Sequence, residues 1–160
     1  MVASILAPLL ASGLGFAIIV TLWWLYFVHT TDTGEHAFER DGDHTKLARS
    51  GLAYAHGIMV AGAIVVAVAI EEIIAHPTDA AHLPTILVAV IGPAIYLLGS
   101  ALFYRTMAER MPLAYLGGLL ALAIVGWAAH AIHASGLLLG FGVLSVMIAL
   151  TVLAARERRA

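Results

Sequence analysis

Two adjacent carboxylates and a histidine close an otherwise apolar stretch, in the segment AIEEIIAHP at residues 69–77. Glu72 and His76 are four residues apart, so they share one face of a helix that continues to residue 76. His130 and His133 are three residues apart and share a face in the same way. Carboxylate and imidazole groups are ligands for zinc, copper, nickel and iron. The spacing therefore predicts a metal site formed by Glu71, Glu72, His76, His130 and His133.

A tetrapyrrole is a second group that these histidines could hold. Gly126 lies four residues before His130, and Ala129 lies four residues before His133. A small residue one helical turn away leaves room for a flat macrocycle such as haem or chlorophyll. In the simplest alternative, the polar side chains lie in water and lipid head groups at a membrane surface and bind nothing. The sequence leaves all three interpretations open.

His56 differs from these residues because it lies well inside an apolar stretch. It is about five residues from the nearer end of that stretch, which is roughly 8 Å along a helix. A buried histidine in a membrane normally faces the bundle and forms a hydrogen bond with a partner. His56 is therefore either a satisfied interhelical residue or a proton-relay or cofactor-binding position.

Five long apolar stretches must position these side chains. The 160 residues are 62% hydrophobic and 11% charged, whereas soluble domains are about 45–50% apolar and about 25% charged. A membrane helix needs about 20 mainly apolar residues. We predict an all-α, polytopic transmembrane bundle that forms a single domain over residues 1–160. Its five spans are expected at about residues 5–28, 50–74, 83–104, 111–131 and 134–155.

All eight Lys and Arg residues fall on one side of this five-span arrangement. They lie between spans one and two, between spans three and four, and after span five. The positive-inside rule makes that side cytoplasmic. The N-terminus is then outside, the C-terminus is cytoplasmic, and residues 30–48 form a cytoplasmic loop. We expect a multi-pass protein of the inner membrane, with the predicted metal ligands together at its outer end.

Three segments resemble, in order and spacing, the C-terminal half of the bacterial low temperature requirement A (LtrA) membrane proteins. They are WWLYF at residues 23–27, AYAHGIMVAGAIVVAVAIEE at 53–72 and AIYLLGSALFYR at 94–105. The resemblance covers roughly residues 20–110 and implies a membrane bundle. It also falls on His56, which favours a functional role there. Proteins of that family are about twice this length, so the resemblance implies a stand-alone half or a truncated homologue. A site shared between the two halves would then require a second chain or copy.

The aromatic segment WWLYF ends the first span. Aromatic side chains with a polar edge favour the membrane interface, so we interpret Trp23, Trp24, Tyr26 and Phe27 as an interfacial belt. Stacking against a ligand is the alternative role for these rings.

Motifs of familiar enzymes are missing from the sequence, which has no GxSxG, no P-loop, no HExxH and no cysteine. The net charge of −2 argues against nucleic acid as a partner. We expect a non-enzymatic, transporter-like or ligand-handling bundle in the lipid bilayer, working as a homo-oligomer or with other membrane subunits. One alternative is an accessory subunit of a respiratory or photosynthetic complex that binds a tetrapyrrole. Another is a metal-dependent membrane enzyme.

Overall fold

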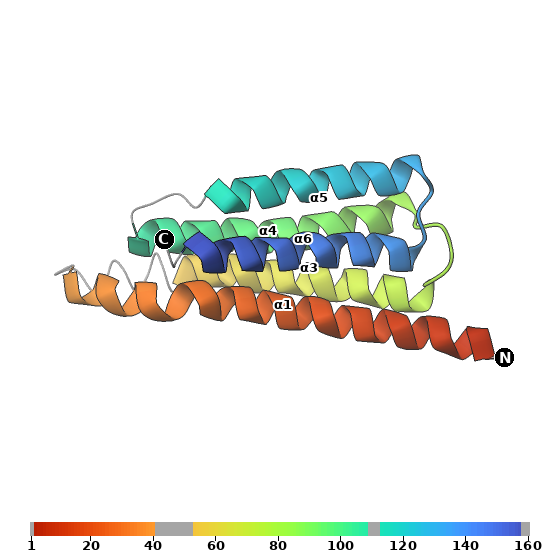
Figure 1. Ribbon diagram of the computed structural model, residues 1–160, viewed down its shortest axis with the longest axis horizontal. Helices are drawn as coiled ribbons and strands as arrows, with labels where there is room; N and C mark the ends of the chain where they lie inside the picture. The colour runs from red at the N-terminus through yellow and green to blue at the C-terminus, as the bar shows by residue number, and fades with distance from the viewer. Residues whose placement is uncertain (1, 41–52, 109–112, 158–160) are drawn as a thin grey trace.

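Long helices make up almost all of the chain that the computed structural model describes, which comprises residues 2–40, 53–108 and 113–157. A π-helical turn at residues 53–55 precedes α3, and the connections at 76–82 and 132–135 are short. Figure 1 shows the helices side by side, each running opposite to the one before. They are α1 (Val2–Arg40), α3 (His56–Ala75), α4 (Leu83–Ala108), α5 (Leu113–Ala131) and α6 (Gly136–Glu157).

Each helix contains a segment long and apolar enough to cross a membrane. The shortest has 18 residues and the longest 23, which corresponds to about 27–35 Å at 1.5 Å per residue. The hydrocarbon core of a bilayer is about 30 Å thick. The prediction of an all-α bundle with five membrane-crossing helices is confirmed. The segments are Ile5–Phe27, Ala53–Ala75, Leu83–Arg105, Ala114–Ala131 and Gly136–Arg156.

The first helix is longer than the span that we expected. It continues to Arg40, so residues 30–40 are helical although we expected them to belong to a loop. This stretch contains Glu35, Ala37 and Glu39, which have good or moderate helix propensity and extend the helix beyond its apolar part. The rest of the expected loop, residues 41–48, lies outside the described residues. The side of the membrane on which it lies stays a prediction.

Helix α4 occupies the centre of the bundle. Half of its membrane-crossing segment is buried, compared with 22% for α5. It contacts α1, α3, α5 and α6, and its contact with α3 is the most extensive between any two helices of the described chain. Pro93 lies inside α4 and is fully buried. Because surrounding helices cover α4, they provide the packing that a proline in a membrane helix requires.

Glycines bring the backbones of α3 and α4 into direct contact. A Cβ atom added to Gly62 would lie 2.5 Å from the backbone nitrogen of Tyr96. One added to Gly92 would lie 2.7 Å from the backbone nitrogen of Val66. Small residues allow membrane helices to associate by close packing. The position of α3 on α4 is therefore fixed by residues that cannot be enlarged without moving a helix.

Backbone hydrogen bonds join the two short connections at one end of the bundle. The amide of Ala81 donates to the carbonyl of Ala134 at 2.8 Å, and the amide of Leu137 donates to the carbonyl of Pro77 at 2.9 Å. Ser135 caps α6, because its hydroxyl accepts from the amide of Leu138 at 3.3 Å. These bonds satisfy amides at the start of α6 and fix the polar residues of both connections.

The described basic residues lie at one end of the bundle, which they share with Glu35, Glu39 and Glu157, whereas the opposite end has acidic groups and histidines without Lys or Arg. Glu71, Glu72 and His130 lie near the end with the two short connections, where the N-terminus also lies, whereas Arg105 and Arg156 lie near the opposite end (Figure 1). The structure thus places these groups at the two ends as the charge pattern predicts. Which end faces the cytoplasm stays a prediction.

Candidate functional site

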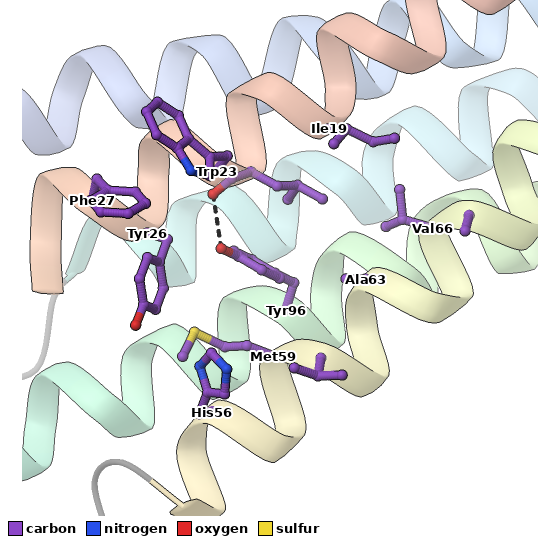
Figure 2. A pocket seen from close by; sticks show the side chains of 12 residues that line it. Ile19, Trp23, Tyr26, Phe27, His56, Met59, Ala63, Val66 and Tyr96 are labelled. Atoms are coloured by element: carbon purple, nitrogen blue, oxygen red, sulfur yellow. Dashed lines mark hydrogen bonds between the residues drawn. The ribbon is translucent and has the colours of Figure 1, made fainter.

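A groove opens between α1 and α3, and Tyr96 of α4 lies at its floor (Figure 2). Its volume is about 360 Å³ and its surface is almost entirely apolar. Small-molecule sites in proteins typically have about 300–1,000 Å³ and a few polar groups in a mainly apolar lining. We call it the α1–α3 groove. Its lining residues are Ile19, Leu22, Trp23, Tyr26, Phe27, His56, Met59, Val60, Ala63, Val66, Ala67 and Tyr96.

The groove exists because α1 and α3 are only loosely packed against each other. Helix α1 makes its main contact with α6, while α3 makes its main contact with α4. On the α3 side, Ala63 and Ala67 face the gap and are too small to fill it. Several lining residues are exposed within membrane-crossing segments, among them Ile19, Trp23 and Val60. The groove therefore opens sideways, toward lipid.

A buried hydrogen bond fixes the floor of the groove. The hydroxyl of Tyr96 donates to the backbone carbonyl of Leu22 at 2.8 Å and so ties α4 to α1 (Figure 2). Below it, the hydroxyl of Ser100 donates to the carbonyl of Tyr96 at 2.9 Å and lies 3.3 Å from the sulfur of Met59. The three helices that form the groove are thus connected by polar contacts as well as by packing.

Aromatic rings form the α1 wall. The ring centroids of Trp23 and Phe27 are 4.6 Å apart, and Tyr26 meets Phe27 edge-on at 5.3 Å. Trp23 is 54% exposed and Phe27 is 42% exposed, so parts of their rings are open to a ligand or to lipid. These rings lie where we expected an interfacial belt, and they also line a cavity. The groove thus favours ligand stacking, the alternative role.

His56 lies on the α3 wall at the mouth of the groove. Its ring meets the ring of Tyr26 at a centroid distance of 5.8 Å and an angle of 64°. The residue is exposed, which differs from the expectation of a histidine buried between helices. The physical reason is the gap between α1 and α3, which leaves this side of α3 without a covering helix. A ligand-binding role for His56 fits this position and stays a prediction.

A second groove of about 320 Å³ lies between α4 and α5, and we call it the α4–α5 groove. Trp127 and His130 are its only aromatic or polar side chains, and the rest of its lining is aliphatic or glycine. A Cβ atom on Gly126 would lie 2.8 Å from a methyl carbon of Val90. Val90 thus occupies part of the space beside Gly126, although Gly126 and His130 line the same groove. Tetrapyrrole binding at His130 stays a prediction.

His76 does not share a helix face with Glu72, because α3 ends at Ala75. Pro77 disfavours helical geometry in the residue before it, and this accounts for the boundary. The imidazole of His76 instead lies 3.4 Å from the carboxylate of Asp79, and both side chains are about two-thirds exposed. The pairing that we predicted from the four-residue spacing is therefore replaced by one within the connection.

His133 also lies beyond its helix, and its position is explained by the turn. Its φ of 51° is in the left-handed region. Its amide donates to the carbonyl of His130 at 3.3 Å, and the amide of Ala134 donates to the carbonyl of Ala129 at 2.9 Å. These two bonds define a Schellman motif, in which glycine is the usual residue at the left-handed position. His133 therefore does not share a helix face with His130.

The described residues contain no group of three or more histidine, aspartate or glutamate side chains placed to hold a metal ion. Glu71, Glu72, His130 and His133 are exposed. The structure brings His76 near Asp79 but does not assemble the five predicted ligands into one site. Metal binding by these residues stays a prediction that their present positions do not support.

The three sequence segments that resemble one family converge on the α1–α3 groove. Trp23, Tyr26 and Phe27 come from the first segment, His56 and Met59 from the second, and Tyr96 from the third. The family model described as bacterial low temperature requirement A protein (LtrA) matches residues 3–154. This chain belongs to the LtrA family. It is an integral membrane protein of that bacterial membrane family, and the match includes α5 and α6, beyond the motifs.

Neither a curated protein nor a solved structure matches the chain. Residues of the site must therefore be chosen from geometry alone. Met59 and Tyr96 were not singled out as site residues in the sequence. Tyr96 lies in the third family-like segment, which is the signal that could have pointed to it.

Proposed function

We propose that this LtrA-family chain is a non-enzymatic membrane protein that binds a membrane-dissolved amphiphile in the α1–α3 groove. The observation that carries the proposal is the convergence of the three family-like segments on one cavity. The groove opens toward lipid, so a ligand could enter from the bilayer and leave its hydrocarbon chain there. Binding of this kind fits a ligand-handling or transporter-like bundle.

The arrangement of polar groups supports binding better than catalysis. The polar atoms at the floor are engaged, since the hydroxyl of Tyr96 donates to Leu22 and that of Ser100 donates to Tyr96. Among the described lining residues, His56 is the only side chain with an ionisable group other than the tyrosines. A general acid or base needs a second group that orients it or receives the proton. One histidine in an apolar groove is suited to fixing a ligand's polar head.

Native mass spectrometry of the protein from mild detergent tests this function. We expect an adduct with the mass of an amphiphile in the unchanged protein. Ala63→Phe places a ring in the groove and should remove the adduct. Ala61→Phe is the matched control, because Ala61 is exposed on the same helix and does not line the groove. An adduct that persists equally in both variants would contradict the proposal.

We also propose that the protein lies in the inner membrane with its N-terminus outside and its C-terminus in the cytoplasm. The distribution of the eight basic residues supports this orientation. The chain has no cysteine, so single cysteines at Asp79 and His44 can be labelled without interference. An impermeant thiol reagent added from the periplasm should label the first position only. Labelling of the second position alone would show the opposite orientation.

Assembly into a homo-oligomer, or with another membrane subunit, completes the proposal. The masses of intact complexes in the same native spectra test it. A strictly monomeric protein that still carries the amphiphile would separate ligand binding from assembly.

A further inference from the structure

The charge of the α1–α3 groove restricts the head group of its ligand. None of the lining residues is Lys, Arg, Asp or Glu. A lipid phosphate is normally recognised by arginine or lysine through charge-assisted hydrogen bonds, and a buried charge without a partner is costly. Within the described residues the groove offers neither a cation for a phosphate nor a carboxylate for an ammonium group. An uncharged head group therefore fits this lining best.

The shape of the α1 wall favours a flat ring over a saturated chain. Trp23 and Phe27 expose parts of their rings to the groove, with centroids 4.6 Å apart. Aromatic rings pack on other rings in offset or edge-on arrangements, and such pairs add to the gain from burial alone. Met59 lies on the opposite wall (Figure 2) and its thioether also interacts favourably with aromatic rings. A hydrocarbon chain would not need these groups.

His56 offers both a donor and an acceptor for the substituents of the ring. The imidazole of His56 has one nitrogen that donates and one that accepts when the ring is neutral. It lies at the mouth of the groove and is exposed. The hydroxyl of Tyr96 is already engaged with the carbonyl of Leu22. An oxygen on the ligand's ring would therefore meet His56 rather than the floor.

From these three features we infer that the ligand of the α1–α3 groove is a quinone or quinol lipid. Its ring packs against Trp23 and Phe27, one ring oxygen forms a hydrogen bond with His56, and its chain extends into the bilayer. This inference rests on the proposed function and narrows it to one chemical class. It concerns binding and assigns no reaction to the ring.

Tryptophan fluorescence tests the inference, because the chain has three tryptophans in different places. The variant Trp24→Phe with Trp127→Phe keeps only Trp23, in the α1–α3 groove. The variant Trp23→Phe with Trp24→Phe keeps only Trp127, in the α4–α5 groove. A benzoquinone with a short alkyl chain should quench Trp23 saturably. It should quench Trp127 only in proportion to its concentration in the detergent or bilayer.

Variants of His56 test the hydrogen bond in the single-Trp23 protein. A hydrogen bond contributes about 1 kcal/mol, so His56→Leu should weaken quinone binding about fivefold. His56→Gln keeps a donor and an acceptor and should retain part of the affinity. Equal affinities for the histidine, leucine and glutamine forms would overturn the assigned hydrogen bond.

Competition distinguishes this inference from the function on which it rests. An alkyl phosphocholine and an alkyl trimethylammonium of the same chain length should not displace the quinone. Suppose that either charged amphiphile binds more tightly than the quinone, and that the Ala63→Phe variant no longer binds it. The proposed amphiphile binding would then hold, and the quinone assignment would be wrong. If Trp23 and Trp127 respond alike to every amphiphile, both are wrong.

Discussion

The α1–α3 groove and the α4–α5 groove have similar volumes, about 360 and about 320 Å³, and one histidine lines each of them. They differ in their walls and in their floor. The first has three aromatic residues on one wall and a floor fixed by the hydrogen bond from Tyr96 to Leu22. The second has Trp127 beside its histidine, His130, and otherwise aliphatic or glycine residues.

This difference shows that volume and a histidine are not enough to indicate a ligand site in a membrane protein. Lipid chains fill any gap that opens sideways from a helix bundle. A site for a particular ligand also needs walls that select a shape and a polar group in a fixed place. Of the two grooves, the α1–α3 groove alone combines an aromatic wall, a histidine and a floor fixed by a hydrogen bond.

The largest expected effect comes from adding one methyl group to a glycine beside each groove. Gly62→Ala should lower the free energy of unfolding by about 1–3 kcal/mol, since its Cβ would meet the backbone of α4. Gly126→Ala should cost less, because its Cβ would meet side chains of α4, nearest a methyl carbon of Val90 at 2.8 Å, rather than the backbone, and because alanine favours the helix. Thermal or denaturant unfolding in detergent measures both. Equal losses of stability would show that the two helix contacts are alike.

A smaller effect of opposite sign is expected at the turn after α5. His133→Gly should raise the free energy of unfolding by about 1 kcal/mol, because glycine adopts the left-handed conformation without strain. His130→Gly is the contrasting variant and should destabilise, since His130 lies within the helix. The same unfolding measurement applies. A loss of stability in His133→Gly would mean that the imidazole makes an important contact and is not there only to continue the turn.

The smallest effect concerns the floor of the α1–α3 groove. Tyr96→Phe removes the hydrogen bond to Leu22 and should cost about 0.6 kcal/mol, a typical value between membrane helices. Tyr54→Phe, at an exposed position, is the control and should change stability less. The effect on ligand affinity should be confined to Tyr96→Phe, because only this change removes the hydrogen bond between α1 and α4. If the ligand affinity of Tyr96→Phe is unchanged, the hydrogen bond from Tyr96 to Leu22 does not contribute to ligand binding.

Much of the fold could be predicted from the sequence because a membrane imposes simple constraints. Apolar stretches of the right length predicted the five membrane-crossing helices, and the order of these helices placed the described basic residues at one end of the bundle. The helix ends were less predictable. Pro77 ends α3 one residue before His76, and the turn at His133 ends α5 before the second histidine of that pair. Residues three or four apart share a face only when both lie within the same helix.

The site itself depended on contacts that no single segment encodes. Of two glycines in α3, Gly62 meets the backbone of a neighbouring helix, while Gly57 faces open space, and nothing in the local sequence distinguishes them. Likewise, the aromatic segment of α1 was interpreted as an interfacial belt because polar-edged aromatic side chains favour the membrane interface. The sequence could not show that α3 forms a wall opposite these rings. Both the contact at Gly62 and the open groove beside the aromatic rings follow from the packing of α3 on α4 and of α1 on α6.

The most direct test of the central claim is a crosslinking map of the unchanged protein in nanodiscs. The probe is an uncharged alkyl amphiphile with a photoreactive diazirine on a phenyl ring, and mass spectrometry locates its adducts. We expect adducts on residues of the α1–α3 groove that disappear when an excess of the unlabelled amphiphile is added. Adducts on the α4–α5 groove should be few and should not respond to competition. Uniform labelling of all lipid-facing helices, unchanged by competitor, would contradict the existence of a ligand site in this protein's α1–α3 groove.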